Sequence, residues 1–194
     1  MKRALVITLT SAALLWGSVA QAEIPPILRP GTHPWFASLS LGVAGKLKDL
    51  MTQFKLVQAV GYHFSGNAGG PAIVFELQES LSDEGGATAY VIEIGPKFQW
   101  DIPIVQGLGF YLTPSAMLGY ARAGWSRGGY YGGDYGANGF TFQIGFEGRL
   151  ILADRWLVFM RPITIDITGG KGCDNCEFDT FVRWDFLIGG GATF

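Results

Sequence analysis

Apolar and polar side chains alternate with a period of two in eight stretches of the chain. Successive side chains of a β-strand point to opposite faces, so this period predicts strands. The clearest stretch is 178–194, where Trp184, Ile188 and Phe194 share one face and Arg183 and Asp185 share the other. The eight stretches are 35–43, 54–64, 73–78, 90–100, 110–120, 140–150, 156–168 and 178–194. The pattern therefore predicts an all-β chain of eight strands.

The connections between these stretches alternate in length, which is typical of an antiparallel up-and-down barrel with both termini on one side. The longer connections are 44–51, 80–87, 124–138 and 169–177, and the shorter ones are 65–71, 101–107 and 153–155. The stretch 156–168 is the least regular, because Arg161 and Asp166 fall on opposite faces of an unbroken strand. We therefore predict a β-bulge near Pro162.

The first 22 residues predict a cleaved signal peptide. Lys2 and Arg3 precede an apolar run over 4–15, and small residues follow at Ala20 and Ala22. An N-terminal membrane anchor is the alternative, although the run is short for a span of about 20 residues. We expect three parts, with the signal peptide at 1–22, a periplasmic lead at 23–33 and a barrel at 34–194.

Composition narrows the possibilities for the remaining chain. Without residues 1–22, which hold two of the 14 basic and none of the 16 acidic residues, the net charge falls from −2 to −4. No basic patch predicts nucleic-acid binding. The 29 glycines and 27 aromatic residues favour β structure with little space for side chains on one face. No later stretch approaches about 18 unbroken apolar residues, so a membrane location requires a barrel; a soluble lipocalin-like ligand carrier is the alternative.

Aromatic residues gather at the strand ends expected on the side of the termini. This is the arrangement of an interfacial girdle. The predicted girdle residues are Trp35, Phe36, Phe64, Trp100, Phe110, Trp156 and Phe194.

With its signal peptide, eight amphipathic strands, aromatic ends and terminal Phe194, the chain resembles the small outer-membrane barrels of the OmpA and OmpX type over residues 34–194. The resemblance implies an eight-stranded transmembrane β-barrel in the outer membrane of a Gram-negative-type envelope. It also implies contact with outer-membrane lipid and lipopolysaccharide, recognition of the C-terminal strand by the outer-membrane assembly machinery, and a monomer.

Charged side chains occupy the face that would line the barrel. The predicted lumen network comprises Lys55, Glu76, Glu93, Lys97, Glu147, Arg149, Asp166, Arg183 and Asp185. An eight-stranded barrel has an interior just wide enough for side chains, and buried charges are expensive unless they are paired. We expect a salt-bridge network that plugs the barrel; a gated path for protons or small ions is the alternative.

Cys173 and Cys176 lie in a longer connection of an exported chain, where disulfides persist. We predict that they form a local structural disulfide. A redox motif would need a βαβ setting, and a zinc site would need ligands closer than His33 and His63. Nearby acidic residues leave weak calcium binding open, but the EF-hand spacing is absent. We predict no metal site and no cofactor.

The stretch 63–69 is the best enzymatic candidate. It is similar to the His-x-Ser-Asn stretch of outer-membrane lipid A deacylases, although Gly66 interrupts the motif. That resemblance implies a serine hydrolase with Ser65 as nucleophile, His63 as base and Glu76 or Glu79 as the orienting carboxylate. A polar Gly/Asn turn is the alternative, and we favour it because the turn falls on the periplasmic side.

The connection 124–138 mixes aromatic residues with glycine, a composition typical of adaptable recognition surfaces. The candidate recognition residues are Trp125, Arg127, Tyr130, Tyr131 and Tyr135. A solvated loop without a ligand is equally compatible with this composition. The sequence therefore predicts a non-enzymatic outer-membrane barrel with a structural or surface-interaction role and leaves an extracellular ligand unidentified.

Overall fold

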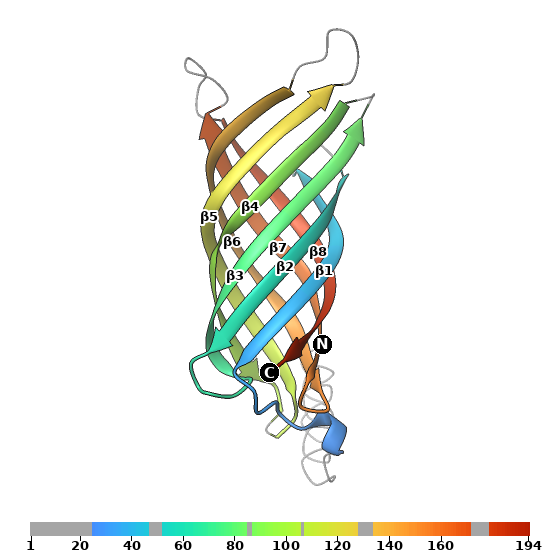
Figure 1. Ribbon diagram of the computed structural model, residues 1–194, viewed down its shortest axis with the longest axis vertical. Helices are drawn as coiled ribbons and strands as arrows, with labels where there is room; N and C mark the ends of the chain where they lie inside the picture. The colour runs from blue at the N-terminus through green and yellow to red at the C-terminus, as the bar shows by residue number, and fades with distance from the viewer. Residues whose placement is uncertain (1–24, 47–51, 85–86, 106, 128–133, 172–178) are drawn as a thin grey trace, which may run out of the picture.

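The computed structural model describes residues 25–46, 52–84, 87–105, 107–127, 134–171 and 179–194, and eight strands in it form one closed antiparallel barrel (Figure 1). The strands are β1 (Trp35–Lys46), β2 (Thr52–His63), β3 (Gly70–Glu84), β4 (Ala87–Pro103), β5 (Phe110–Arg127), β6 (Asp134–Leu152), β7 (Trp156–Lys171) and β8 (Asp179–Thr193). Each strand pairs with its neighbours in sequence, and β1 closes the ring by pairing with β8. The predicted all-β, eight-stranded up-and-down architecture is confirmed.

The two ends of the barrel differ. Both the start of β1 and the end of β8 lie at one end, together with residues 64–69, 104–105, 107–109 and 153–155 of the three connections there (Figure 1). We call this the turn end and the opposite one the loop end. Among the residues described, no helix has the length and apolar character needed to span a membrane.

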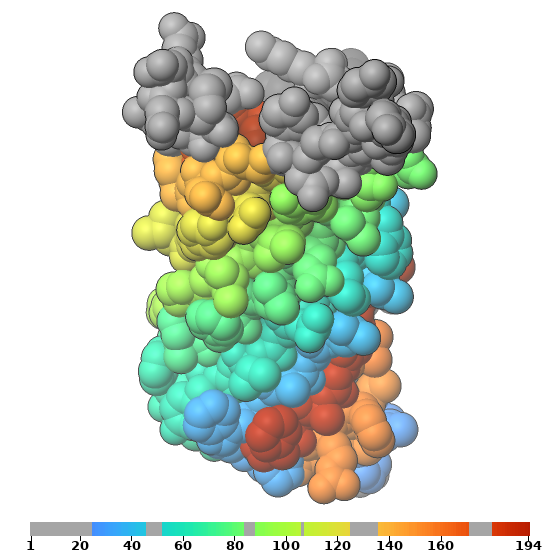
Figure 2. Space-filling model, turned by 45° about the horizontal axis from the view of Figure 1, so that its top comes forward, coloured from blue at the N-terminus to red at the C-terminus, as the bar shows by residue number. Residues whose placement is uncertain are grey.

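The alternation of the sequence decides which residues are buried. Charged side chains lie inside the barrel and apolar side chains are exposed on its outer face, which is the reverse of a soluble protein. Along β2 every second residue from Gln53 to His63 is buried, including Lys55, while Phe54 and Val60 are half-exposed. The wall seen from outside is a continuous surface of side chains (Figure 2). An apolar exterior around a polar interior is typical of membrane barrels, and it contradicts the lipocalin-like alternative, which needs apolar residues inside.

Phe36 is a correction to the predicted girdle. Its side chain is 1% exposed and lies inside the barrel, whereas its neighbour Trp35 is 48% exposed on the outside. Adjacent residues of a strand point to opposite faces, so the two cannot both contact lipid. The ring of Phe36 lies over Gly61, its partner in the β1–β2 register, and a Cβ atom there would collide with it. The other six girdle residues are 40–59% exposed.

The strands extend further toward the loop end than the sequence pattern predicted. Residues Trp125 and Arg127 belong to β5, and Tyr135 belongs to β6, where it pairs with Trp125. The prediction that these three residues lie in a loop is therefore wrong. Gly, Ser and Asn residues interrupt the apolar alternation there, but the hydrogen-bonded ladder continues because pairing depends on the backbone.

The irregularity predicted in β7 is present. The β7–β8 register shifts between Arg161 and Thr164, on either side of Pro162. A bulge inserts an extra residue and changes which side chains point inward. Arg161 and Asp166 are both buried inside the barrel as a result.

The segment before β1 packs across the turn end. It contains a short 3-10 helix, η1 (Pro26–Leu28), and its backbone carbonyls accept hydrogen bonds from all three connections there. The pairs are Ala153 N to Ile27 O at 2.7 Å, Gly109 N to Leu28 O at 2.7 Å and Ala68 N to Gly31 O at 3.1 Å. Residues 25–33 therefore hold the three turns together, while residues 1–22, the predicted signal peptide, lie outside the described residues.

Asp154 fastens this segment to the β6–β7 turn. Its carboxylate accepts a 2.7 Å hydrogen bond from the Thr32 hydroxyl and another from the Thr32 backbone N–H. Partial burial acts to raise the pKa of Asp154, but the two hydrogen bonds from Thr32 and the nearby His33 hold that pKa below its ordinary value. A carboxyl with a lowered pKa in the folded state stabilises that state most when it is ionised.

Asp154→Asn is expected to loosen the segment 25–34 without unfolding the turn, because asparagine tolerates the positive φ of 58° found at this position. Hydrogen exchange of this segment, measured by mass spectrometry, should be severalfold faster in the variant at pH 7. In the wild-type protein the protection should persist above the ordinary aspartate pKa of about 3.9 and should be lost as the pH falls below it.

Asp83→Asn, which removes an exposed carboxylate at the loop end, is the matched control and should leave this exchange unchanged. Equal protection in wild type and Asp154→Asn would show that backbone hydrogen bonds alone hold the segment.

Candidate functional site

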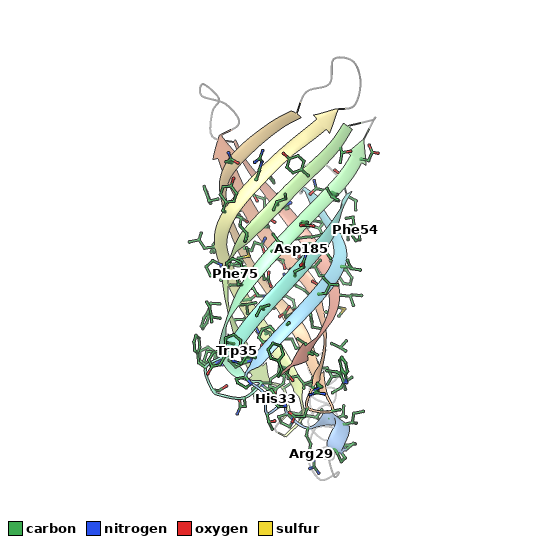
Figure 3. The ribbon with its side chains drawn as sticks, in the orientation of Figure 1. Arg29, His33, Trp35, Phe54, Phe75 and Asp185 are labelled. Carbon is green, nitrogen blue, oxygen red and sulfur yellow. The ribbon has the colours of Figure 1, made fainter. Side chains whose placement is uncertain are left out.

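The interior of the barrel contains the largest group of charged side chains in the described part of the molecule. All nine predicted lumen charges are at most 4% exposed. Figure 3 shows the contrast between the two faces, with Asp185 directed into the barrel and Phe54 and Phe75 directed outward. The strands impose this arrangement because their inward positions alternate with outward-facing apolar positions.

Arg183 is the centre of the cluster nearer the loop end. Its guanidinium contacts the carboxylates of Glu93 and Asp166, with Nη2 lying 2.5 Å from Glu93. Lys55 pairs with Asp185 at 2.6 Å and also lies 3.8 Å from Glu93. Five strands supply these side chains and their amide and hydroxyl partners, so the cluster ties together parts of the barrel wall that are not neighbours.

Arg161 is the centre of the next cluster toward the turn end. Its Nη2 atom lies 2.9 Å from the Glu76 carboxylate, and its Nε atom lies 3.3 Å from Glu147. Lys97 forms a second ion pair with Glu76. The two carboxylates and two cations of this cluster balance in charge.

A pair of amides connects the two clusters. The side chains of Gln78 and Gln143 exchange two hydrogen bonds of 2.9 Å across the barrel. Gln78 also donates to Glu76 at 2.8 Å, and Gln143 donates to Glu93 at 3.3 Å. Hydrogen bonding therefore continues along the interior, which lowers the cost of burying these polar groups.

Asp101 is the centre of the cluster at the turn end. It accepts hydrogen bonds from Arg149 at 2.8 Å and Thr113 at 2.6 Å, and it lies 2.7 Å from Nε2 of His63. Arg149 also lies over the ring of Phe36, with its Cζ atom 4.6 Å from the ring centroid. A cation over an aromatic face is a stabilising contact, and it gives the inward Phe36 an electrostatic role.

Sequence reasoning missed several members of this network. Arg161 was left out of the predicted network, although the predicted bulge brings it to the same face as Asp166. Asp101 was assigned to a turn, although Lys97 and Gln99 already point inward and the same period reaches Asp101. His63 was considered only as a catalytic candidate. The signal that could have identified Asp101 was the uninterrupted period of two through β4.

Little free space remains inside the barrel. One interior cavity has a volume of about 10 Å³ and is lined by residues that include Glu76, Lys97, Arg149 and Arg161. A cavity of this size holds about one water molecule. The side chains of the described interior are therefore closely packed around this cavity.

The fold has counterparts of known structure. Neisserial surface protein A (NspA) is 11% identical, with a TM-score of 0.66 over 84% of this chain and 98% of that protein. A major outer membrane protein from Thermus thermophilus is 12% identical, with a TM-score of 0.55 over 84% of this chain and the whole of that protein. The fold is that of the small outer-membrane β-barrels. No protein-family model and no curated protein sequence matches the chain.

Within this outer-membrane barrel fold, the candidate hydrolase residues do not form a triad. Both ring nitrogens of His63 are engaged, Nδ1 with the Pro34 carbonyl at 3.1 Å and Nε2 with Asp101. The Ser65 hydroxyl lies in the turn, where it is hydrogen-bonded to Asn67 at 3.0 Å and to the Gly69 carbonyl. Glu76 is bound by Arg161 and Lys97 instead of His63, and Glu79 is half-buried on the outer face. The structure therefore supports the alternative interpretation of 63–69 as a polar turn.

Four of the remaining candidates cannot be compared with their predicted roles. Tyr130, Tyr131, Cys173 and Cys176 fall outside the described residues, so the recognition and disulfide predictions for them stay predictions. Among the described residues, no group of three or more His, Cys, Asp and Glu side chains is arranged to hold a metal ion.

Proposed function

We propose that the chain is an integral outer-membrane protein with a closed lumen, whose role is structural or depends on surface interactions at the loop end. The observation that carries this proposal is the inversion of polarity across the barrel wall. Outward residues such as Phe75, Leu118 and Ile188 are 55–63% exposed, while the paired charges are buried inside the barrel. A soluble protein rarely exposes an apolar surface of this extent, whereas lipid tails would cover it in a membrane.

The packed interior argues against transport through the lumen. A cavity of about 10 Å³ gives no continuous path, and opening one would require the separation of buried ion pairs such as those of Arg161 and Arg183. Breaking a buried pair typically costs about 3–5 kcal/mol. With transport through the lumen disfavoured, we place the interaction surface at the loop end, where the two longest strands, β5 and β6, meet.

The first test follows the whole protein in the cell envelope. We expect it to fractionate with outer membranes, to require detergent for extraction, and to migrate differently on a gel when it is not heated. Reconstituted into a planar bilayer, it should show no stepwise conductance above the background of the lipid. Extraction without detergent would contradict the membrane proposal, and reproducible conductance steps would contradict the closed lumen.

The lipid A hydrolase remains the second candidate named by the sequence, and the geometry does not favour it. Ser65→Ala should leave the acylation of lipid A unchanged, as measured by mass spectrometry of lipid A from cells that express either form. Loss of a deacylated species in the variant alone would reinstate the hydrolase.

A further inference from the structure

A group of polar side chains lies on the outer surface of the barrel at the loop end. It consists of Tyr90 on β4, Arg122 and Tyr120 on β5, and Asn138 on β6, around Gly136. The strand registers pair Arg122 with Asn138 and pair both Tyr90 and Gly136 with Gly124, so these residues are neighbours across three strands. We call them the rim cluster.

Two polar atoms of the rim cluster lie close to Gly136. A Cβ atom added at Gly136 would lie 3.5 Å from Tyr90 Oη and 3.7 Å from Arg122 Nη2. The absence of a side chain at Gly136 therefore leaves a methyl-sized space beside the hydroxyl and the guanidinium, and we call this space the notch. Tyr120 donates a 2.6 Å hydrogen bond to Asn138 Oδ1, which leaves the Asn138 amide nitrogen available as a third donor.

Arg122 has no acidic counterpart in the described part of the chain. The buried cations Lys55, Lys97, Arg149, Arg161 and Arg183 each contact a carboxylate, whereas no described carboxylate lies within 4.0 Å of the Arg122 guanidinium. Its side chain is exposed on the same face as the lipid-facing apolar residues. A guanidinium in this position can form paired hydrogen bonds with an external anion.

The depth of the rim cluster matches the boundary between lipid tails and headgroups. Phe110 belongs to the aromatic girdle at the turn end, and Arg122 lies on the same strand and the same face. Twelve residues of a strand at about 3.3 Å per residue, tilted by about 40°, rise roughly 30 Å, while the apolar band of such barrels is about 25 Å tall. Tyr120, 47% exposed, precedes Arg122 at the upper edge of that band.

We propose that the rim cluster binds the phosphate group of a lipid in the outer leaflet, of the phosphorylated-sugar type found in lipopolysaccharide. Arg122 supplies the charge and a planar pair of donors, while Tyr90 and Asn138 donate from the two flanking strands. The notch at Gly136 admits the phosphate oxygens between them. This inference rests on the proposed outer-membrane location and adds a specific lipid contact to it.

The test uses the full chain, refolded in neutral detergent micelles and titrated with diphosphorylated lipid A, with bound lipid counted by native mass spectrometry. Arg122→Gln should weaken the apparent affinity about tenfold, which corresponds to about 1.4 kcal/mol. Asn138→Ala and Tyr90→Phe should each weaken it by a smaller factor of about three. Lipid A without phosphates should bind weakly, and its apparent affinity should be the same for wild type and for Arg122→Gln.

Arg155→Gln is the matched control, because it removes an exposed arginine at the turn end and should leave the affinity unchanged. Equal loss in both arginine variants would show a general charge effect and overturn the site, as would an Arg122→Gln variant with wild-type affinity. Displacement of lipid A by millimolar inorganic phosphate would instead assign the notch to a free anion. A heat-dependent gel shift verifies that each variant is folded, and outer-membrane fractionation tests the underlying location separately.

Discussion

Arg183→Met is expected to lower the free energy of unfolding by about 3–5 kcal/mol. Arg183 lies 1% exposed between Glu93 and Asp166, and methionine would fill much of its volume without its charge. Among the described side chains, Lys55 would then be the one cation left in this cluster to face Glu93, Asp166 and Asp185. The buried carboxylates would lose their principal partner and remain charged without compensation. This loss is large, although the intact ion pairs stabilise a protein little more than apolar residues of the same volume would.

Denaturant unfolding in lipid vesicles, followed by tryptophan fluorescence, measures this loss. Arg155→Met changes the same residue type at an exposed position of the turn end and should shift the free energy by less than about 0.5 kcal/mol. Adding Glu93→Gln to Arg183→Met should recover part of the stability, because one of the unpaired charges is removed. Wild-type stability of Arg183→Met would show that the interior tolerates unpaired carboxylates.

Ala116→Arg is expected to lower the free energy of unfolding by about 2–4 kcal/mol in a bilayer. Ala116 is exposed on β5, midway between Phe110 and Arg122, and its register partners Phe98 and Ile144 are apolar and exposed. The new guanidinium would therefore be close to the middle of the lipid tails. The cost arises from the removal of a charge from water, since no side chain is lost from a packed core.

Ala116→Leu is the matched control, because it adds volume at the same position without charge and should leave stability almost unchanged. The same denaturant titration compares the two variants with wild type. If Arg and Leu were equally tolerated at this position, the outward face of β5 would not contact lipid, and the membrane proposal would lose its main support.

The sequence predicted the inward residues and the bulge better than it predicted the ends of the strands. The period of two decided which residues face inward in most of β2, β4, β6 and β8, because a regular ladder leaves no other choice. It also predicted the irregularity at Pro162, since Arg161 and Asp166 could not share a face without one. The strand ends at Trp125 and Tyr135 were missed, because backbone pairing continues where the apolar alternation stops.

By itself, the sequence determined the number of strands, their antiparallel order and the separation of an apolar face from a charged one. These are properties of local periodicity and connection length. Only the tertiary structure decided which charges meet, as in the pairing of Arg161 with Glu76 and of Lys55 with Asp185, residues 85 and 130 positions apart. Those contacts depend on the register with which the barrel closes and on the bulge in β7, and neither is encoded in the neighbourhood of any single residue.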